Sequence, residues 1–166
     1  MSINLYLYWQ AELYPAAGVL GKQIEKVFFL IKSIPVAPLE PPAAGWDTFR
    51  GQYDVHFLLE ALLAPQGKDL VLWLVSVDIG DPWHSYVFGA AGKQRAIVST
   101  ARIENLEDVC KEACHEVGHL LGLQHCRNNC CMRPSWTVRG IRNKPANLCE
   151  QCCNLLASLK GGADTD

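Results

Sequence analysis

One segment of eleven residues constrains the fold of this chain more than any other. It reads His115-Glu116-Val117-Gly118-His119-Leu120-Leu121-Gly122-Leu123-Gln124-His125. Four residues advance a helix by about 400°, so His115 and His119 project from one helix face about 6 Å apart along the axis. A continuing helix would carry His125 about 9 Å further and turn it away. Because glycine adopts a left-handed conformation without steric cost, the spacing predicts that the helix ends at Gly122 and the chain reverses there.

Three histidines brought together in this way are typical of a catalytic zinc site. Three neutral imidazoles leave one position of a tetrahedral zinc open, and a water is expected there. Zinc lowers the pKa of such a water to about 7, and Glu116 is placed to accept its proton. The resulting hydroxide would attack a carbonyl that zinc polarises, and Glu116 would return the proton to the leaving amine. The motif therefore predicts hydrolysis of peptide bonds.

Composition and charge exclude two classes of partner. Lysine and arginine number 15 against 17 acidic residues, a net charge of −2, so we expect no nucleic-acid partner. Charged residues interrupt the apolar stretch 19–34, and no run approaches the ~18 residues of a membrane helix. Residues 1–4 lack the basic start of a signal peptide, and most of the eight cysteines cluster late in the chain. We therefore expect a cytoplasmic protein without a membrane partner.

The late cysteines predict a second zinc site. Cys126 follows the third histidine, and Cys130 and Cys131 come soon after it. Cys149 and Cys152 follow later in the spacing CxxC. Four thiolates in two close pairs form a closed tetrahedral site, which holds zinc structurally and contributes folding free energy.

With these motifs the sequence resembles the archaemetzincins, a family of metzincin-type zinc metalloproteases. The family pattern is HExxHxxGxxHC, four residues, CxM, 17 residues and CxxC. The resemblance implies that His115, His119 and His125 bind catalytic zinc and that Glu116 is the general base. It also implies that Cys126 begins the second zinc site and that Met132 is the residue of the Met-turn beneath the catalytic zinc.

The chain departs from this family pattern at two gaps. Three residues separate Cys126 from Cys130 and 16 separate Met132 from Cys149, so each gap is one residue shorter. If CxM fixes the register, Cys130 is the second structural ligand, and if the four-residue gap fixes it, Cys131 is. Cys153 is a further rival to Cys152. Two cysteines on the predicted zinc helix, Cys110 and Cys114, are expected to be buried thiols.

The resemblance implies an α/β fold of the metzincin-like zinc metalloprotease type. A twisted mixed β-sheet would carry the active-site helix, followed by a small C-terminal subdomain stapled by zinc. We expect one catalytic domain, 1–166, with an N-terminal subdomain of about 1–122, a C-terminal subdomain of about 123–166 and the cleft between them. In metzincins a substrate pairs with an antiparallel edge strand above the zinc, a role that we assign to residues 86–90.

Hydrophobic periodicity predicts the elements around this helix. Alternation from Ile3 predicts a first strand, and a helical pattern follows over 17–31. Residues 35–42 contain four prolines and are expected to form a loop. We expect a second helix over 53–63, a central strand over 70–77 and short strands over 86–89 and 96–100. The zinc helix should span about 105–122, and a last helix about 147–160.

Two functions other than catalysis are compatible with these motifs. A zinc-stabilised protein with the same cleft could bind peptides with little or no turnover, and a purely structural protein would bear metal at the cysteines alone. Glu116 favours a peptidase that acts on peptides or unfolded protein segments, because a binding protein has no evident use for a carboxylate beside zinc. Side-chain preference, endopeptidase or exopeptidase action and oligomeric state are not encoded in these motifs.

Overall fold

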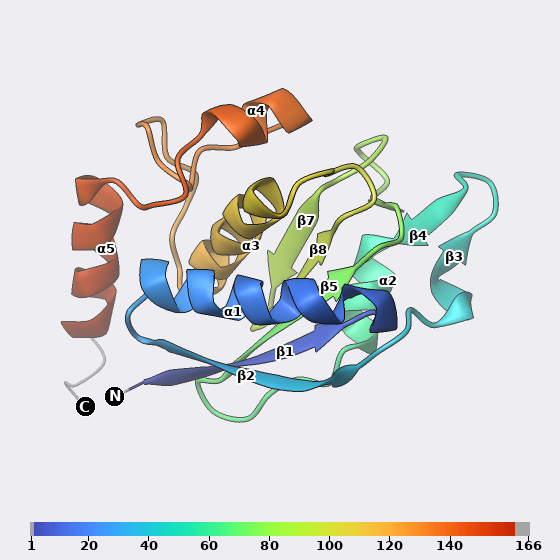
Figure 1. Cartoon of the computed structure of the whole chain (residues 1–166), viewed down its shortest axis with the longest axis horizontal. Helices are drawn as coiled ribbons and strands as arrows, with labels where there is room; N and C mark the ends of the chain where they lie inside the picture. The colour runs from blue at the N-terminus through green and yellow to red at the C-terminus, as the bar shows by residue number, and fades with distance from the viewer. Residues whose placement is uncertain (1, 162–166) are drawn as a thin grey trace.

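A five-stranded sheet forms the centre of the protein in a computed structural model that describes residues 2–161 (Figure 1). Its strand order is β2-β1-β5-β8-β7. The parallel strands are β1 (Ile3–Trp9), β2 (Ile31–Pro38), β5 (Leu70–Val75) and β8 (Arg95–Ser99). The edge strand β7 (Gly89–Gly92) pairs with β8 in the antiparallel sense. The sheet is therefore mixed, as predicted.

The side chains of β5 build a hydrophobic core on each face of the sheet. All of its residues are buried, which confirms the predicted central strand. Its three leucines face a core shared with α1 (Tyr14–Val27) and α3 (Leu106–Leu120). Its two valines and Trp73 face the opposite core, shared with α2 (Val55–Ala61). The helices α1 and α3 cover the same face of the sheet, and α3 packs directly against β7 and β8 (Figure 1).

Two smaller parts flank the central sheet at opposite ends of the molecule (Figure 1). A three-stranded sheet joins β3 (Trp46–Asp47), β4 (Gln52–Asp54) and β6 (Ile79–Gly80). The chain after α3 forms the other part, with α4 (Val138–Asn143) and α5 (Glu150–Gly161). Within residues 2–161, no helix combines the length and the apolar character needed to cross a membrane.

The structure corrects several predicted boundaries. The helix predicted over 17–31 ends at Val27, and Ile31 begins β2, although the apolar spacing continues across the turn. The proline-rich loop predicted over 35–42 is wrong at its start, because Pro35 and Pro38 belong to β2. Proline lacks the amide donor of a ladder, and β2 tolerates it as an edge strand. The strand predicted over 86–89 begins at Gly89, after an isolated bridge between Val87 and Ile79.

Candidate metal centre and active site

The C-terminal end of α3 has the geometry that the histidine spacing predicts. The helix ends at Leu120, and Gly122 follows with a φ of +91°, which glycine adopts without strain. The amide of Gly122 donates to the carbonyl of His119, and the amide of Leu123 donates to the carbonyl of Gly118, both at 3.0 Å. These two bonds satisfy carbonyls that the helix leaves free. The chain therefore reverses at Gly122.

The reversal brings three imidazole rings together. The ring centroids of His115, His119 and His125 are 4.7, 4.9 and 5.2 Å apart, and one ligand nitrogen of each lies within 4.8 Å of the others. The Nε2 atoms of His115 and His119 are separated by 3.1 Å. Two nitrogens bound to one tetrahedral zinc at about 2.0–2.1 Å would lie about 3.3 Å apart. The observed separation fits zinc.

Backbone carbonyls hold two of these rings in the orientation that brings their Nε2 atoms together. Nδ1 of His115 donates to the carbonyl of Cys131, and Nδ1 of His119 donates to the carbonyl of Leu123, each at 2.9 Å. A protonated Nδ1 leaves the lone pair of Nε2 free, which is the tautomer that a metal requires. Burial, followed by the charge of Lys144, lowers the pKa of His115 to about 3, so its ring is neutral.

Glu116 is buried between α3 and the edge strand β7. A Cβ atom on Gly89 would lie 2.9 Å from Cγ of Glu116 and 2.8 Å from the carbonyl oxygen of Ile97, closer than real Cβ atoms approach other atoms. Glycine thus lets β7 lie directly against the carboxyl side chain. Burial first, and then the charge of Glu112, raise the pKa of Glu116 well above its ordinary value. Its carboxylate consequently holds a proton more readily than that of a surface glutamate.

Met132 packs against α3 at Gly118, the one glycine within Leu106–Leu120. A Cβ atom on Gly118 would overlap Sδ of Met132, and Met132 is fully buried. The carbonyl of Met132 accepts a hydrogen bond of 3.0 Å from the amide of Cys126. Met132 therefore lies where the histidine site and the first cysteine meet.

Four thiols form a second cluster beside the histidines. The Sγ atoms of Cys126, Cys130, Cys149 and Cys152 all lie within 4.8 Å of one another. Those of Cys126 and Cys149 are 3.7 Å apart, whereas a disulfide bond measures about 2.05 Å. Two thiolates on a tetrahedral zinc at about 2.3 Å would lie about 3.8 Å apart. A hydrogen bond from Asn128 is the largest of the effects that lower the pKa of Cys149 to about 6, which favours the thiolate.

The remaining cysteines lie outside this four-thiol cluster. The sequence left Cys130 and Cys131 open as the second ligand, and the cluster contains Cys130. Burial raises the pKa of Cys131 to about 12. Cys153, the rival of Cys152, is exposed. On α3, Cys110 and Cys114 are buried, and burial raises the pKa of both thiols, that of Cys110 to about 11.

A cleft of about 220 Å³ lies in front of the histidines and Glu116. Residues 86–89 form one rim, which is most of the segment predicted as the edge strand over 86–90. Residues 134–136, which follow Met132, form the other rim. Sequence reasoning did not assign the second rim, because Trp136 lies in a loop and no local pattern connects it with the histidines.

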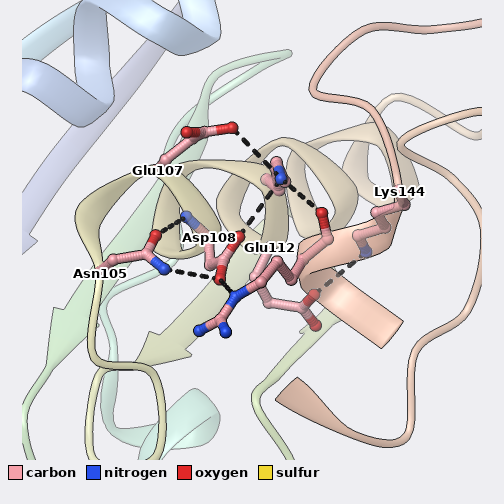
Figure 2. Close-up of polar contacts among 7 residues, drawn as sticks. Asn105, Glu107, Asp108, Glu112 and Lys144 are labelled. Carbon is pink, nitrogen blue, oxygen red and sulfur yellow. Dashed lines mark hydrogen bonds and ion pairs between the residues drawn. The ribbon is translucent and has the colours of Figure 1, made fainter. Parts of the chain in front are cut away.

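A buried ion pair joins the cleft to the chain after α3. Nζ of Lys144 lies 3.2 Å from Oε2 of Glu112 and donates to the carbonyl of Arg133 at 3.3 Å. Lys144 and Glu112 are almost fully buried, and Glu112 lines the cleft. Figure 2 shows the contact between the two side chains. This pair was not predicted from the sequence, because its partners are 32 residues apart.

A second cluster of polar side chains connects the start of α3 with α4 (Figure 2). Asn105 caps α3 by accepting a hydrogen bond of 2.8 Å from the amide of Asp108. The carboxylate of Asp108 accepts from Asn105 at 2.8 Å, from Lys111 at 3.3 Å and from Arg142 at 3.4 Å. Since Arg142 belongs to α4, both ends of α3 are attached to the C-terminal part of the chain.

A carboxyl group buried beside three converging imidazoles, two of them from successive turns of one helix, suits the activation of water at a metal. Together with the fold, this defines the class of the protein as a zinc metallopeptidase.

A family model described as "Peptidase family M54" matches residues 95–158. The archaemetzincin of Nanoarchaeum equitans is 41% identical over 115 residues, which cover 69% of this chain and 68% of the relative. That of Methanocaldococcus jannaschii is 33% identical over 153 residues, 82% of this chain and 83% of the relative. The chain belongs to the archaemetzincin family.

Solved structures show the same fold. The archaemetzincin of Methanopyrus kandleri superimposes with a TM-score of 0.85 at 30% identity and covers 96% of each chain. That of Archaeoglobus fulgidus gives 0.84 at 29% identity, over 92% of this chain and 99% of the other. The predicted family, α/β fold and zinc cofactor are therefore confirmed, and the protein is a zinc-dependent peptidase with a three-histidine catalytic site and a four-cysteine structural zinc site.

Proposed function

We propose that Glu116 is the general base that this peptidase uses to hydrolyse peptide bonds in the cleft between β7 and α3. The observation that carries the proposal is the burial of its carboxylate against Gly89, at the floor of the cleft and next to the three histidines. Zinc held by His115, His119 and His125 would supply Lewis-acid activation of the attacking water and the scissile carbonyl. The carboxylate of Glu116 takes a proton from that water and delivers it to the leaving amine.

The substrate is a peptide or an unfolded segment that binds through its main chain. β7 lies at the edge of the sheet, where its backbone groups are available to an added strand. Phe88 is buried in one core and Val87 packs against the other, so their side chains point away from a substrate. Pairing with main-chain groups supports recognition of extended chains with varied side chains.

We assign Cys126, Cys130, Cys149 and Cys152 as the ligands of the structural zinc, and Met132 as the residue of the Met-turn. The choice of Cys130 over Cys131 rests on the Sγ distances within the cluster. The fit of Met132 against Gly118 supports its assignment, because the residue of a Met-turn packs apolarly beneath the zinc.

We also propose that the chain works as one catalytic domain in the cytoplasm. The two rims of the cleft come from the two predicted subdomains. Residues 86–89 belong to the subdomain 1–122, and residues 134–136 belong to the subdomain 123–166. All eight cysteines lie in the described part of the chain and none of them forms a disulfide bond, which favours a reducing compartment.

Incubation of the protein and its Glu116→Gln variant with a diverse peptide library tests the catalytic assignment. We expect cleaved bonds, identified by mass spectrometry, with the parent alone, although both proteins hold the same amount of zinc. Equal cleavage by the variant would refute Glu116 as the base. Cleavage by neither protein would instead support a peptide-binding protein with little turnover.

A further inference from the structure

Three aromatic residues join the two rims of the cleft at one of its ends. The ring of His84 stacks on Trp136, with centroids 5.5 Å apart and planes inclined by 19°. Tyr86 donates its hydroxyl hydrogen to the carbonyl of Trp136 at 3.1 Å. His84 and Tyr86 precede β7, whereas Trp136 follows Met132, so these contacts cross the cleft. We call the three residues the aromatic bridge.

The His84 side of the aromatic bridge is held in place by its own loop. Nδ1 of His84 lies 3.0 Å from both carboxylate oxygens of Asp81. Asp81 also accepts hydrogen bonds from the amides of Trp83 and His84, at 2.8 and 2.7 Å. The guanidinium of Arg50 donates to the carbonyls of Asp81 and His84. These contacts fix the imidazole against Trp136.

The Tyr86 side is fixed by a charged pair. The guanidinium of Arg102 lies 4.1 Å from the centroid of the Tyr86 ring. Arg102 also donates two hydrogen bonds to the carboxylate of Asp78, at 2.8 and 2.7 Å. A cation above an aromatic face and a bidentate carboxylate pair both restrict orientation. The Tyr86 ring of the aromatic bridge is thus held by Arg102, which Asp78 in turn keeps in position.

The aromatic bridge lies beside the residues that precede β7, and this position determines which end of a bound peptide it would block. In an antiparallel pair, the carboxyl-terminal half of one strand lies beside the amino-terminal half of its neighbour. A peptide paired antiparallel with β7 would therefore extend its carboxyl-terminal part past residues 86–88. Tyr86 and Trp136 both line the cleft there, and the hydrogen bond between them spans it from one rim to the other. The aromatic bridge therefore lies across the path that the carboxyl-terminal part of the peptide would take.

We propose that the aromatic bridge closes the carboxyl-side end of the cleft, so that this peptidase prefers peptides with a short segment after the scissile bond. The preference rests on the proposed function and on pairing of the substrate with β7. Trp136 is then the residue that determines specificity for substrate length, and His84 and Tyr86 position it.

Two series of peptides with blocked termini test this proposal. Both contain one cleaved core sequence, which is lengthened one residue at a time on the carboxyl side in the first series and on the amino side in the second. For the parent we expect kcat/KM to fall by about tenfold or more as the carboxyl side grows, and to stay level as the amino side grows. In Trp136→Ala the fall should disappear, and Tyr86→Phe, which keeps the ring and loses one hydrogen bond, should reduce it.

Trp83→Ala is the matched control, because Trp83 is an exposed tryptophan in the loop before residues 86–89 and lies outside the aromatic bridge. It should keep the length dependence of the parent. Equal cleavage of all carboxyl-side lengths by the parent, or a fall that persists unchanged in Trp136→Ala, would overturn the proposal.

Binding to the Glu116→Gln variant separates this proposal from the proposed catalytic function. Dissociation constants of both series, measured by calorimetry with zinc-loaded protein, report fit without turnover. Weaker binding of peptides long on the carboxyl side, abolished by adding Trp136→Ala, supports the aromatic bridge even if no peptide is cleaved. Binding that is independent of length overturns it, whether or not Glu116 acts as the base.

Discussion

Removal of Lys144 is expected to destabilise the protein strongly, because its ammonium group is the cation beside the buried carboxylate of Glu112. The side chains are 1% and 7% exposed, and they lie 3.2 Å apart. In Lys144→Met the new side chain fills the space without charge, and Glu112 keeps no ionic partner among the residues that the structure describes. Removing one member of a buried ion pair costs about 3–5 kcal/mol.

A second substitution separates the charge from the packing. Lys144→Met also leaves the carbonyl of Arg133 without its donor, a further cost of about 1–3 kcal/mol. In the double variant Lys144→Met/Glu112→Leu this second cost remains and the unpaired carboxylate is gone. The double variant should therefore be more stable than the single variant by about 3–5 kcal/mol. A chain of this size changes its melting temperature by about 2–4 °C per kcal/mol, which gives a difference of about 6–20 °C.

Thermal unfolding of zinc-loaded proteins, followed by circular dichroism, measures this difference. Lys93→Met is the matched control, since Lys93 pairs with Glu60 at the surface and its loss should cost about 0–1 kcal/mol. Burial raises the pKa of Glu112, so the single variant takes up a proton on folding and loses stability as the pH rises above the ordinary pKa of glutamate. The reasoning fails if the single and double variants melt at the same temperature.

Three further predictions concern packing, pH and metal. Gly118→Ala should lower the free energy of unfolding in urea by about 1–3 kcal/mol because Met132 must move, whereas Gly18→Ala in α1, which meets no atom within 4 Å, should raise it by about 0.5–1 kcal/mol. Burial raises the pKa of Asp108, but hydrogen bonds from Asn105 and Lys111 outweigh this and hold it below its ordinary value. The stability that this carboxylate supplies is complete above the ordinary pKa and is lost as the pH falls through the folded-state pKa, so urea midpoints at about pH 2–6 should fall less in Asp108→Asn than in the parent. Chelation of zinc should raise hydrogen exchange in α5 well before that in β5, and simultaneous loss of protection in both would contradict a structural role for the cysteine cluster.

The sequence predicted those features that depend on neighbours along the chain. The apolar run at β5 predicted a strand buried on both faces, and the histidine spacing predicted the end of α3 at Gly122. It also predicted two groups of metal ligands, because HExxHxxGxxH and paired cysteines are local patterns. In each of these features a short segment contains the information that fixes its conformation.

Features that depend on distant contacts were missed. The short strands β3, β4 and β6 contain two or three residues each, too few to show a period. The helix α4 has six residues and was not predicted. The choice of Cys130 over Cys131 depends on where Cys149 lies in space, and the stacking of His84 on Trp136 joins residues that no pattern relates.

The zinc content of four proteins tests most directly whether one chain builds a histidine site and a four-cysteine site. Native mass spectrometry of the parent, His119→Ala, Cys130→Ser and Cys131→Ser counts bound zinc ions. We expect two in the parent, one in His119→Ala, one in Cys130→Ser and two in Cys131→Ser, in accord with the two ligand clusters. A parent with a single zinc ion, or loss of zinc from Cys131→Ser while Cys130→Ser keeps both, would contradict the assignment.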